Sequence, residues 1–263
     1  MKKYGGTLVH KLVGTLGDIE VVEDLHYLSL HFGSEATQSR MDKAVPHRLV
    51  LGYTRAMTAG LLLNPEPQRI LLVGLGGGSL AKFFHHYFPQ CHIDAVEYSP
   101  EVCEVARSHF YLPDDGRIHL HIDDGGHFLR TADLETFADY DLILVDAFEA
   151  RNIAYSVCGL SFYDACRDRL SANGILSINL WSGDWITAPE MLDAVRTSFN
   201  HQVLKLNVEG KANIIGLAMK QPPSRQHIRL LSKHAMELQR RYDIEYPALL
   251  RTLRQLNPHI SLV

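Results

Sequence analysis

The chain has 263 residues, of which 46% are apolar and 21% are charged, and its formal net charge is −4 at pH 7. This length and composition are ordinary for a soluble protein with one large α/β domain or a main domain with a small appendage. The acidic balance and the scattered basic residues exclude a strong nucleic-acid-binding face, and no apolar run is long enough to cross a bilayer. We therefore expect a soluble, cytoplasmic protein with no nucleic-acid or membrane partner.

Residues 1–45 form the first predicted unit. Three short stretches rich in β-forming residues, 7–13, 19–24 and 27–32, are separated by turn residues. They predict a small N-terminal antiparallel β domain. The polar stretch 33–45 is expected to be the joint to the next unit.

Residues 46–220 carry the pattern of a larger α/β unit. Pro46 is a favourable first helical residue, and the apolar spacing over 47–63 predicts a helix. After this helix, strand and helix patterns alternate, and the uniformly apolar strands are typical of a parallel sheet with helices on both faces. The remaining residues, 221–263, predict an amphipathic helical tail that is interrupted near Pro247.

Cysteine and histidine spacing gives no metal signature. The four cysteines match neither a zinc site nor a redox Cys-x-x-Cys motif, so buried free thiols in a reducing compartment explain them best. The pairs His85/His86 and His119/His121 lack the spacing and the carboxylates of a metal site. The sequence therefore predicts no bound metal.

A glycine-rich loop follows the first strand of the predicted sheet. Ligands of an open parallel sheet bind beyond the carboxyl ends of its strands, and GLGGGS places Gly74, Gly76, Gly77 and Gly78 there. Glycine lets the backbone approach a ligand closely, and the next helix presents free N–H groups. A tight turn packed against the sheet is the alternative explanation.

Carboxylates follow the next three strands. Glu97 stands about twenty residues after the glycine loop, where a carboxylate binds both ribose hydroxyls of a nucleoside. Asp124, followed by Gly125, stands where it accepts a hydrogen bond from the amine of adenine. Asp146 and Glu149 end the fourth strand, and two carboxylates in a cleft attract cations. A solvated strand end, a helix N-cap at Asp146 and a surface charge at Glu149 are the alternatives.

These residues resemble the spermidine/spermine synthase family, the polyamine aminopropyltransferases, over about residues 17–220. The resemblance rests on ATQSRMD, GLGGGS, DAVEYSPEV, Asp124-Gly125, VDAFEA, LSFYDACRDRLSANGILSINL and the Trp185 segment. It implies a small β domain in front of a Rossmann-like sheet of the class I methyltransferase type. It also implies a homo-oligomer, a dimer or a tetramer, of which we expect the dimer.

The resemblance assigns roles to individual residues. It implies that Gln38, Glu97 and Asp124 hold the adenosyl thioether of the donor, that Asp146 is the catalytic base and that Glu149 helps bind the amine. A carboxylate suits that role because an alkylammonium, with a pKa near that of lysine at about 10, must lose a proton before it attacks a sulfonium carbon.

The chain departs from the family pattern on the substrate side. Gly77 stands where the family has an Asp that receives the amino end of the aminopropyl chain. The residues from Asp146 to Glu149 replace an Asp-Ser-Ser-Asp motif, and a late Tyr-Pro segment is missing between Val208 and Asn213. A glycine in the loop removes the repulsion toward the carboxylate of intact S-adenosylmethionine and offers it an N–H group. The expected donor substrate is therefore decarboxylated S-adenosylmethionine or S-adenosylmethionine itself.

Aromatic residues beside the predicted cleft are candidates for contact with adenine or an alkylammonium. Tyr98 and Trp185 follow strands at the same edge as the carboxylates, and Tyr53 matches a family tyrosine at a longer spacing from Gln38. Core packing is the alternative for each. Trp181 lies near the same edge but is a weaker candidate than Trp185.

The leading hypothesis is a transferase that moves an aminopropyl group to an amine of a small polyamine. One alternative is methyl or aminocarboxypropyl transfer from S-adenosylmethionine, and another is an adenosyl-binding family member without turnover. A nicotinamide-dependent oxidoreductase is disfavoured, because Ser79 stands where its fingerprint has Gly or Ala.

Overall fold

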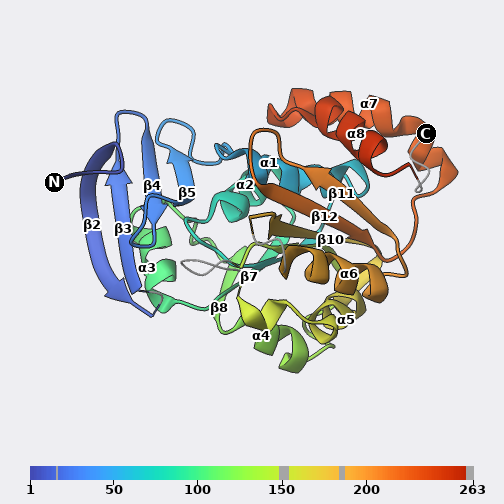
Figure 1. Cartoon of the computed structure of the whole chain (residues 1–263), viewed down its shortest axis with the longest axis horizontal. Coiled ribbons are helices and arrows are strands. Elements are labelled where there is room, and N and C mark those ends of the chain that lie inside the picture. The colour runs from blue at the N-terminus through green and yellow to red at the C-terminus, as the bar shows by residue number, and fades with distance from the viewer. Residues whose placement is uncertain (16, 148–153, 184–186, 259–263) are drawn as a thin grey trace.

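The structure is a computed structural model that describes residues 1–15, 17–147, 154–183 and 187–258. Two sheets organise these residues, a small antiparallel sheet at the N-terminus and a larger mixed sheet covered by helices (Figure 1). The two sheets lie side by side, and the last helices pack on the side of the large sheet far from the small one (Figure 1). This arrangement confirms the predicted α/β class with a small β unit in front.

The small sheet contains five strands in sequence order. They are β1 (Lys2–Lys3), β2 (Gly6–Gly14), β3 (Gly17–Glu23), β4 (Tyr27–His31) and β5 (Thr37–Asp42). The prediction that residues 33–45 are only a polar joint is wrong, because residues 37–42 of this segment form strand β5. Ser39 and Met41 are buried although their neighbours are polar, which gives the strand one inward face despite its polar sequence.

The large sheet has seven strands in the order β11-β12-β10-β9-β6-β7-β8. They are β6 (Arg69–Val73), β7 (His92–Glu97), β8 (Ile118–Ile122), β9 (Tyr140–Val145), β10 (Leu170–Trp181), β11 (Val203–Asn207) and β12 (Asn213–Met219). Strands β6 to β10 are parallel, as predicted, whereas β12 pairs antiparallel with both β10 and β11. The carboxyl ends of the parallel strands therefore meet at one edge.

Helices cover both faces of this sheet. The helices are α1 (Gly52–Met57), η1 (Thr58–Leu62), α2 (Ser79–Tyr87), α3 (Pro100–Ser108), α4 (Gly125–Thr131), η2 (Tyr155–Val157), α5 (Leu160–Arg169), α6 (Thr187–Ser198), α7 (Arg225–Tyr242) and α8 (Tyr246–Leu256). One core joins η1, α2, α7 and α8 to the sheet, and a second core joins α4, α5 and α6 to the opposite face. The domain limits at residues 45 and 220 stay predictions.

The helix expected from Pro46 begins later than predicted, at Gly52. The Asp42 carboxylate accepts hydrogen bonds from the backbone N–H groups of Ala44 and Val45, which holds the chain in a turn instead. Leu51 is extended, with a ψ of 135°, so the helix starts only after it. No described helix is long and apolar enough to span a membrane.

Strand β5 and helix α3 fasten the small sheet to the large one. Val102 and Val105 of α3 pack in one buried cluster with residues of β3, β4 and β5. Lys82 of α2 is also buried here, and its Nζ donates to the carbonyl oxygens of Gly77 at 2.9 Å and Phe110 at 2.6 Å and contacts the Sδ of Met41 at 3.2 Å. Burial lowers the pKa of Lys82 to about 7.

Arg169, the last residue of α5, is buried beside the second core, the one formed by α4, α5 and α6. It is only 2% exposed, and its guanidinium donates to the backbone carbonyls of Leu129, Ala132 and Phe137 at 2.6–2.9 Å. These bonds satisfy carbonyls at and after the end of α4 that have no helical partner. No carboxylate of the described residues bonds to this guanidinium.

We expect Arg169→Met to lower the free energy of unfolding by about 3 kcal/mol or more, because it leaves buried carbonyls unsatisfied. Urea unfolding followed by circular dichroism measures the change. Arg196→Met is the control, since the Arg196 side chain is partly exposed and its ion pair with the exposed Asp193 lies at the surface, where such pairs contribute about 0–1 kcal/mol. Equal effects of the two substitutions would contradict the structural role of Arg169.

Candidate active site

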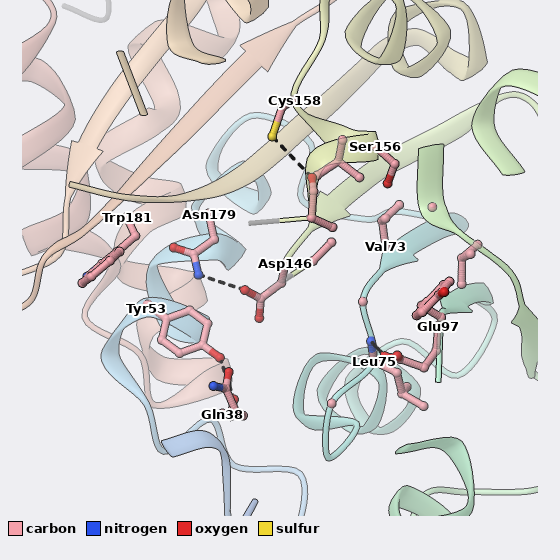
Figure 2. Close-up of a pocket in the computed structure, with 18 of the residues that line it drawn as sticks. Gln38, Tyr53, Val73, Leu75, Glu97, Asp146, Ser156, Cys158, Asn179 and Trp181 are labelled. Atoms are coloured by element: carbon pink, nitrogen blue, oxygen red, sulfur yellow. Dashed lines mark hydrogen bonds between the residues drawn. The ribbon is translucent and has the colours of Figure 1, made fainter. Parts of the chain in front are cut away.

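A cavity of about 1480 Å³ lies at the carboxyl edge of the parallel strands. Its wall is formed by the ends of β6, β7, β9 and β10 on one side and by β5 and α1 on the other. Figure 2 shows Asp146 in its middle, with Asn179 and Trp181 to one side and Leu75 and Glu97 to the other. The cavity therefore has two ends, and the Asp146 carboxyl group lies between them.

Only the first three residues of the glycine loop, 74–76, line the cavity. Gly74 and Gly76 line the cavity, and both have positive φ angles, of 96° and 53°, that disfavour other residues. A side chain at Gly74 would also run into the backbone carbonyl of Asp146. Glycine is required here because β6 turns sharply beside the end of β9.

Gly77 and Gly78 do not line this cavity, contrary to the prediction. The N–H of Gly77 donates to the Oγ of Ser39 at 2.8 Å, so β5 already uses the group that was expected to bind a donor carboxylate. A Cβ at Gly77 would lie 2.9 Å from the Phe110 ring. Gly78 instead begins α2 with a φ of 69°, packed against Leu112. Packing explains these two glycines.

Glu97 lines the cavity at the end of β7 and is only 7% exposed. Its carboxylate accepts hydrogen bonds from the backbone N–H of Leu75 at 2.9 Å and of Ser99 at 3.0 Å. Burial raises the pKa of Glu97, and these bonds partly oppose the rise. A carboxylate has lone pairs for further donors, so it can also accept ribose hydroxyls.

Asp124 and Gly125 lie at the same end of the cavity, where α4 begins. One Asp124 oxygen caps the helix by accepting from the N–H of His127 at 2.8 Å, and the other accepts from the Oγ of Ser156 at 2.6 Å. Tyr98, the residue after Glu97, also lines the cavity, and it is about half exposed. The structure thus brings the predicted nucleoside-binding residues of three strand ends to one cavity.

Asp146 directly follows β9 and lines the cavity. Burial raises its pKa to about 6, and a hydrogen bond from the Nδ2 of Asn179, 2.8 Å long, opposes the rise. The Asn179 oxygen in turn accepts from the Nδ2 of Asn213 at 3.0 Å, which points the Asn179 NH₂ group at the carboxylate. The carboxylate is fixed in position and is ionised at neutral pH.

Tyr53 and Gln38 close the cavity from the side of the small sheet. The Tyr53 hydroxyl donates to the backbone carbonyl of Gln38 at 3.1 Å (Figure 2). Burial and the nearby Asp146 charge raise the pKa of Tyr53 well above its usual value, so it stays a neutral hydrogen-bond donor. Both predicted residues therefore lie within reach of the Asp146 side of the cavity.

Two predicted residues, Glu149 and Trp185, lie outside the residues that the structure describes. Trp181, at the end of β10, lines the cavity and is 41% exposed. Sequence reasoning missed Asn179 and Asn213, although Asn179 is the polar residue that interrupts the apolar end of β10. Asp146 was easier to identify, because it is the first polar residue after β9, whereas Asn179 lies within β10.

Among the described residues, no three His, Cys, Asp or Glu side chains gather in a group that could hold a metal ion. The polar groups of the cavity instead suit an organic ligand that carries hydroxyls, an amine and positive charge. Apolar walls with a few convergent carboxylates are typical of small-molecule sites.

Residues 51–208 match the family model described as the spermine/spermidine synthase domain. The chain belongs to the spermine/spermidine synthase family. Across 250 residues it is 35% identical to a polyamine aminopropyltransferase of Chromobacterium violaceum, and the match covers 95% of this chain and 94% of that one. The family and its fold are therefore shown along nearly the full length.

Solved structures of other proteins have the same fold. A probable spermidine synthase from Corynebacterium glutamicum superposes with a TM-score of 0.74 at 18% identity and covers 88% of each chain. Human methyltransferase-like protein 13 in complex with SAH gives a TM-score of 0.63 at 28% identity, covering 72% of this chain and 93% of that one. The same fold thus occurs in a probable spermidine synthase and in a methyltransferase-like protein.

The raised pKa of Asp146 predicts a pH-dependent stability change in Asp146→Asn. The carboxyl pKa rises from about 4 in the unfolded chain to about 6 in the folded one, so the folded state loses stability as pH increases between these values. The asparagine variant lacks this loss. We expect its melting temperature to exceed that of the wild type at pH 8 and the difference to shrink toward pH 4.

Differential scanning fluorimetry across pH 4–8 measures this difference. Asp193→Asn is the matched control, because Asp193 is exposed on α6. A gain for Asp146→Asn that does not vary with pH would show that burial of the charge is not its cause.

Proposed function

We propose that this family member is an aminopropyltransferase that uses decarboxylated S-adenosylmethionine to alkylate a small amine. The carboxylate of Asp146, fixed between a nucleoside-type end and a second polar end of one cavity, is the observation that carries the proposal. The relatives named polyamine aminopropyltransferases support the same reaction. A polyamine or related amine is the expected acceptor.

The reaction is a single displacement. The acceptor nitrogen forms a bond to the propyl carbon, the bond from that carbon to sulfur breaks, and its electron pair stays on sulfur as a neutral thioether. The proton that the nitrogen loses passes to the Asp146 carboxylate and then to solvent. Since the sulfonium is already a good leaving group, the protein contributes mainly the orientation of the two reactants and the proton acceptor.

The electrostatics of Asp146 fit this role. A carboxyl pKa of about 6 leaves the group ionised at neutral pH but makes it a stronger base than an ordinary aspartate. The Asn179 hydrogen bond and the neutral Tyr53 hydroxyl hold the charge in place without neutralising it. An ammonium group entering the cavity would therefore be both attracted and oriented.

We assign the donor to the end of the cavity that contains Glu97 and Asp124. Their carboxylates have the placement for ribose hydroxyls and for the adenine amine, with Tyr98 beside the ring and Gly74 and Gly76 beneath the chain. Gln38 would contact the donor from the small sheet. Membership in the family further supports a cytoplasmic homodimer as the form in which this enzyme works.

Methyl transfer from S-adenosylmethionine is the second candidate. The glycine loop presents no carboxylate for the amino end of an aminopropyl chain, because Gly77 occupies that position. The 28% identity to human methyltransferase-like protein 13, solved with SAH, favours the same alternative. The nucleoside end of the cavity would serve both donors equally.

Product analysis with each donor separates the two candidates. We expect decarboxylated S-adenosylmethionine to give an aminopropylated amine and methylthioadenosine at least tenfold faster than S-adenosylmethionine gives a methylated amine. Mass spectrometry of the amine and the nucleoside measures both. A methylated amine and S-adenosylhomocysteine as the main products would assign the chain to the second candidate.

The Asn179 bond predicts a shifted pH profile in Asn179→Ala. Activity requires the ionised carboxylate, so kcat should rise with pH around 6 in the wild type. Loss of the Asn179 bond, which lowers the pKa of Asp146, should move this rise to higher pH. Steady-state kcat between pH 5 and 9 measures the shift, with exposed Asn207→Ala on β11 as the control. An unmoved profile with lower kcat would contradict electrostatic coupling.

A further inference from the structure

The charged residues of the cavity fall into two groups. Glu97, Asp124 and Asp146 are all occupied by hydrogen bonds within the protein. Lys211 and Glu190 line the same cavity, are exposed, and form no ion pair with any residue that the structure describes. An unpaired cation and an unpaired carboxylate are therefore available to a ligand.

Two arginines also line the cavity, and they differ from Lys211 in their partners or their position. Arg40 pairs with Asp24 at 2.7 Å and stacks on the Tyr27 ring. Arg130 lies at the nucleoside end, where its Nη1 is 3.4 Å from the carbonyl oxygen of Ser156. Arg130 also forms no ion pair with a described residue, but it lies beside Ser156, whereas Lys211 is two residues from Asn213 and therefore on the Asn179 side of Asp146.

Lys211 belongs to the end of the cavity beyond Asp146. It lies in the loop between β11 and β12, and its N–H donates to the carbonyl of Val208 at 3.1 Å. Two residues later, Asn213 bonds to Asn179, the partner of Asp146. Because two residues span at most about 7 Å, the Lys211 backbone lies close to this hydrogen-bonded chain.

Glu190 reaches the cavity from α6. It is in the first turn of that helix, and α6 packs against β12, where Leu192 lies 3.7 Å from the position of a Cβ built on Gly216. The helix therefore runs beside the strand that begins at Asn213. The Glu190 carboxylate and the Lys211 ammonium group therefore come from two neighbouring elements and border the part of the cavity beyond Asp146, which we call the acceptor end.

This pair of charges suits a zwitterion better than a diamine. A diamine carries only positive charge, so Lys211 repels its far end while Glu190 attracts it. An α-amino acid head group presents a carboxylate to Lys211 and an ammonium to Glu190, and both contacts are favourable. A side-chain amine on the same molecule can extend toward Asp146.

We propose that the acceptor is a basic amino acid whose side-chain amine is alkylated at Asp146 while Lys211 binds its α-carboxylate and Glu190 its α-ammonium. This inference rests on the proposed aminopropyl transfer and specifies its acceptor. The side-chain nitrogen gains the propyl carbon, sulfur keeps the electrons of the broken bond, and the nitrogen proton goes to Asp146.

Acceptors in matched pairs test the proposal, because ornithine and lysine are putrescine and cadaverine with an added α-carboxylate. With decarboxylated S-adenosylmethionine we expect kcat/KM to be at least tenfold higher for each amino acid than for its diamine. Lysinamide, which lacks the carboxylate charge, should resemble cadaverine. Lys211→Gln should lower kcat/KM for lysine at least tenfold more than for cadaverine.

Lys233→Gln is the control for removal of one positive charge, since Lys233 is exposed on α7 and is not a cavity residue. It should leave both values unchanged. A wild-type preference for the diamines, or an equal effect of Lys211→Gln on lysine and cadaverine, would overturn the proposal while leaving aminopropyl transfer intact.

Calorimetric titration in the presence of methylthioadenosine tests the same contacts without turnover. We expect lysine to bind at least tenfold more tightly than cadaverine, and Lys211→Gln to abolish that difference. If no acceptor is alkylated by any donor, the proposed function is wrong, but this binding preference still decides the assignment of Lys211. Equal affinities of lysine and cadaverine would refute it.

Discussion

The buried carboxylate of Glu97 is the interaction on which the site depends. It accepts one N–H from the glycine loop after β6 and another from the turn after β7, so a single side chain joins two neighbouring strand-to-helix turns. Without these bonds the carboxylate would be costly to bury and the two turns would have no common anchor. This end of the cavity is therefore built around a carboxylate that accepts its hydrogen bonds from the backbone.

Asp146 is the second buried carboxylate of the cavity. Burial raises the pKa of both Glu97 and Asp146, and the hydrogen bonds that each accepts oppose the rise. The two differ in their donors, which are backbone N–H groups at Glu97 and a side-chain amide at Asp146. A carboxylate with a pKa of about 6, as at Asp146, retains more affinity for a proton than an ordinary aspartate.

The sequence was sufficient for the α/β class, the alternation of strands and helices along the chain and the placement of Glu97 and Asp146 at the ends of their strands, because apolar runs and the first polar residues after them are local patterns. It failed at strand β5, whose polar residues form a strand only because the small sheet buries Ser39 and Met41. It also failed at Gly77, whose N–H faces a partner from the distant small sheet. Asn213 and Lys211 reach the cavity through an antiparallel strand pair, and pairing of that kind is not encoded in any short segment.

The contacts of Ser39 and Met41 have a consequence for how such enzymes diverge. Strand β5 bonds to the glycine loop through Ser39 and approaches the Lys82 ammonium through Met41. The small sheet, which contributes no parallel strand, thus supports the glycine loop. Swapping that sheet between relatives would disturb the cavity unless the loop glycines and the lysine beneath them were exchanged along with it.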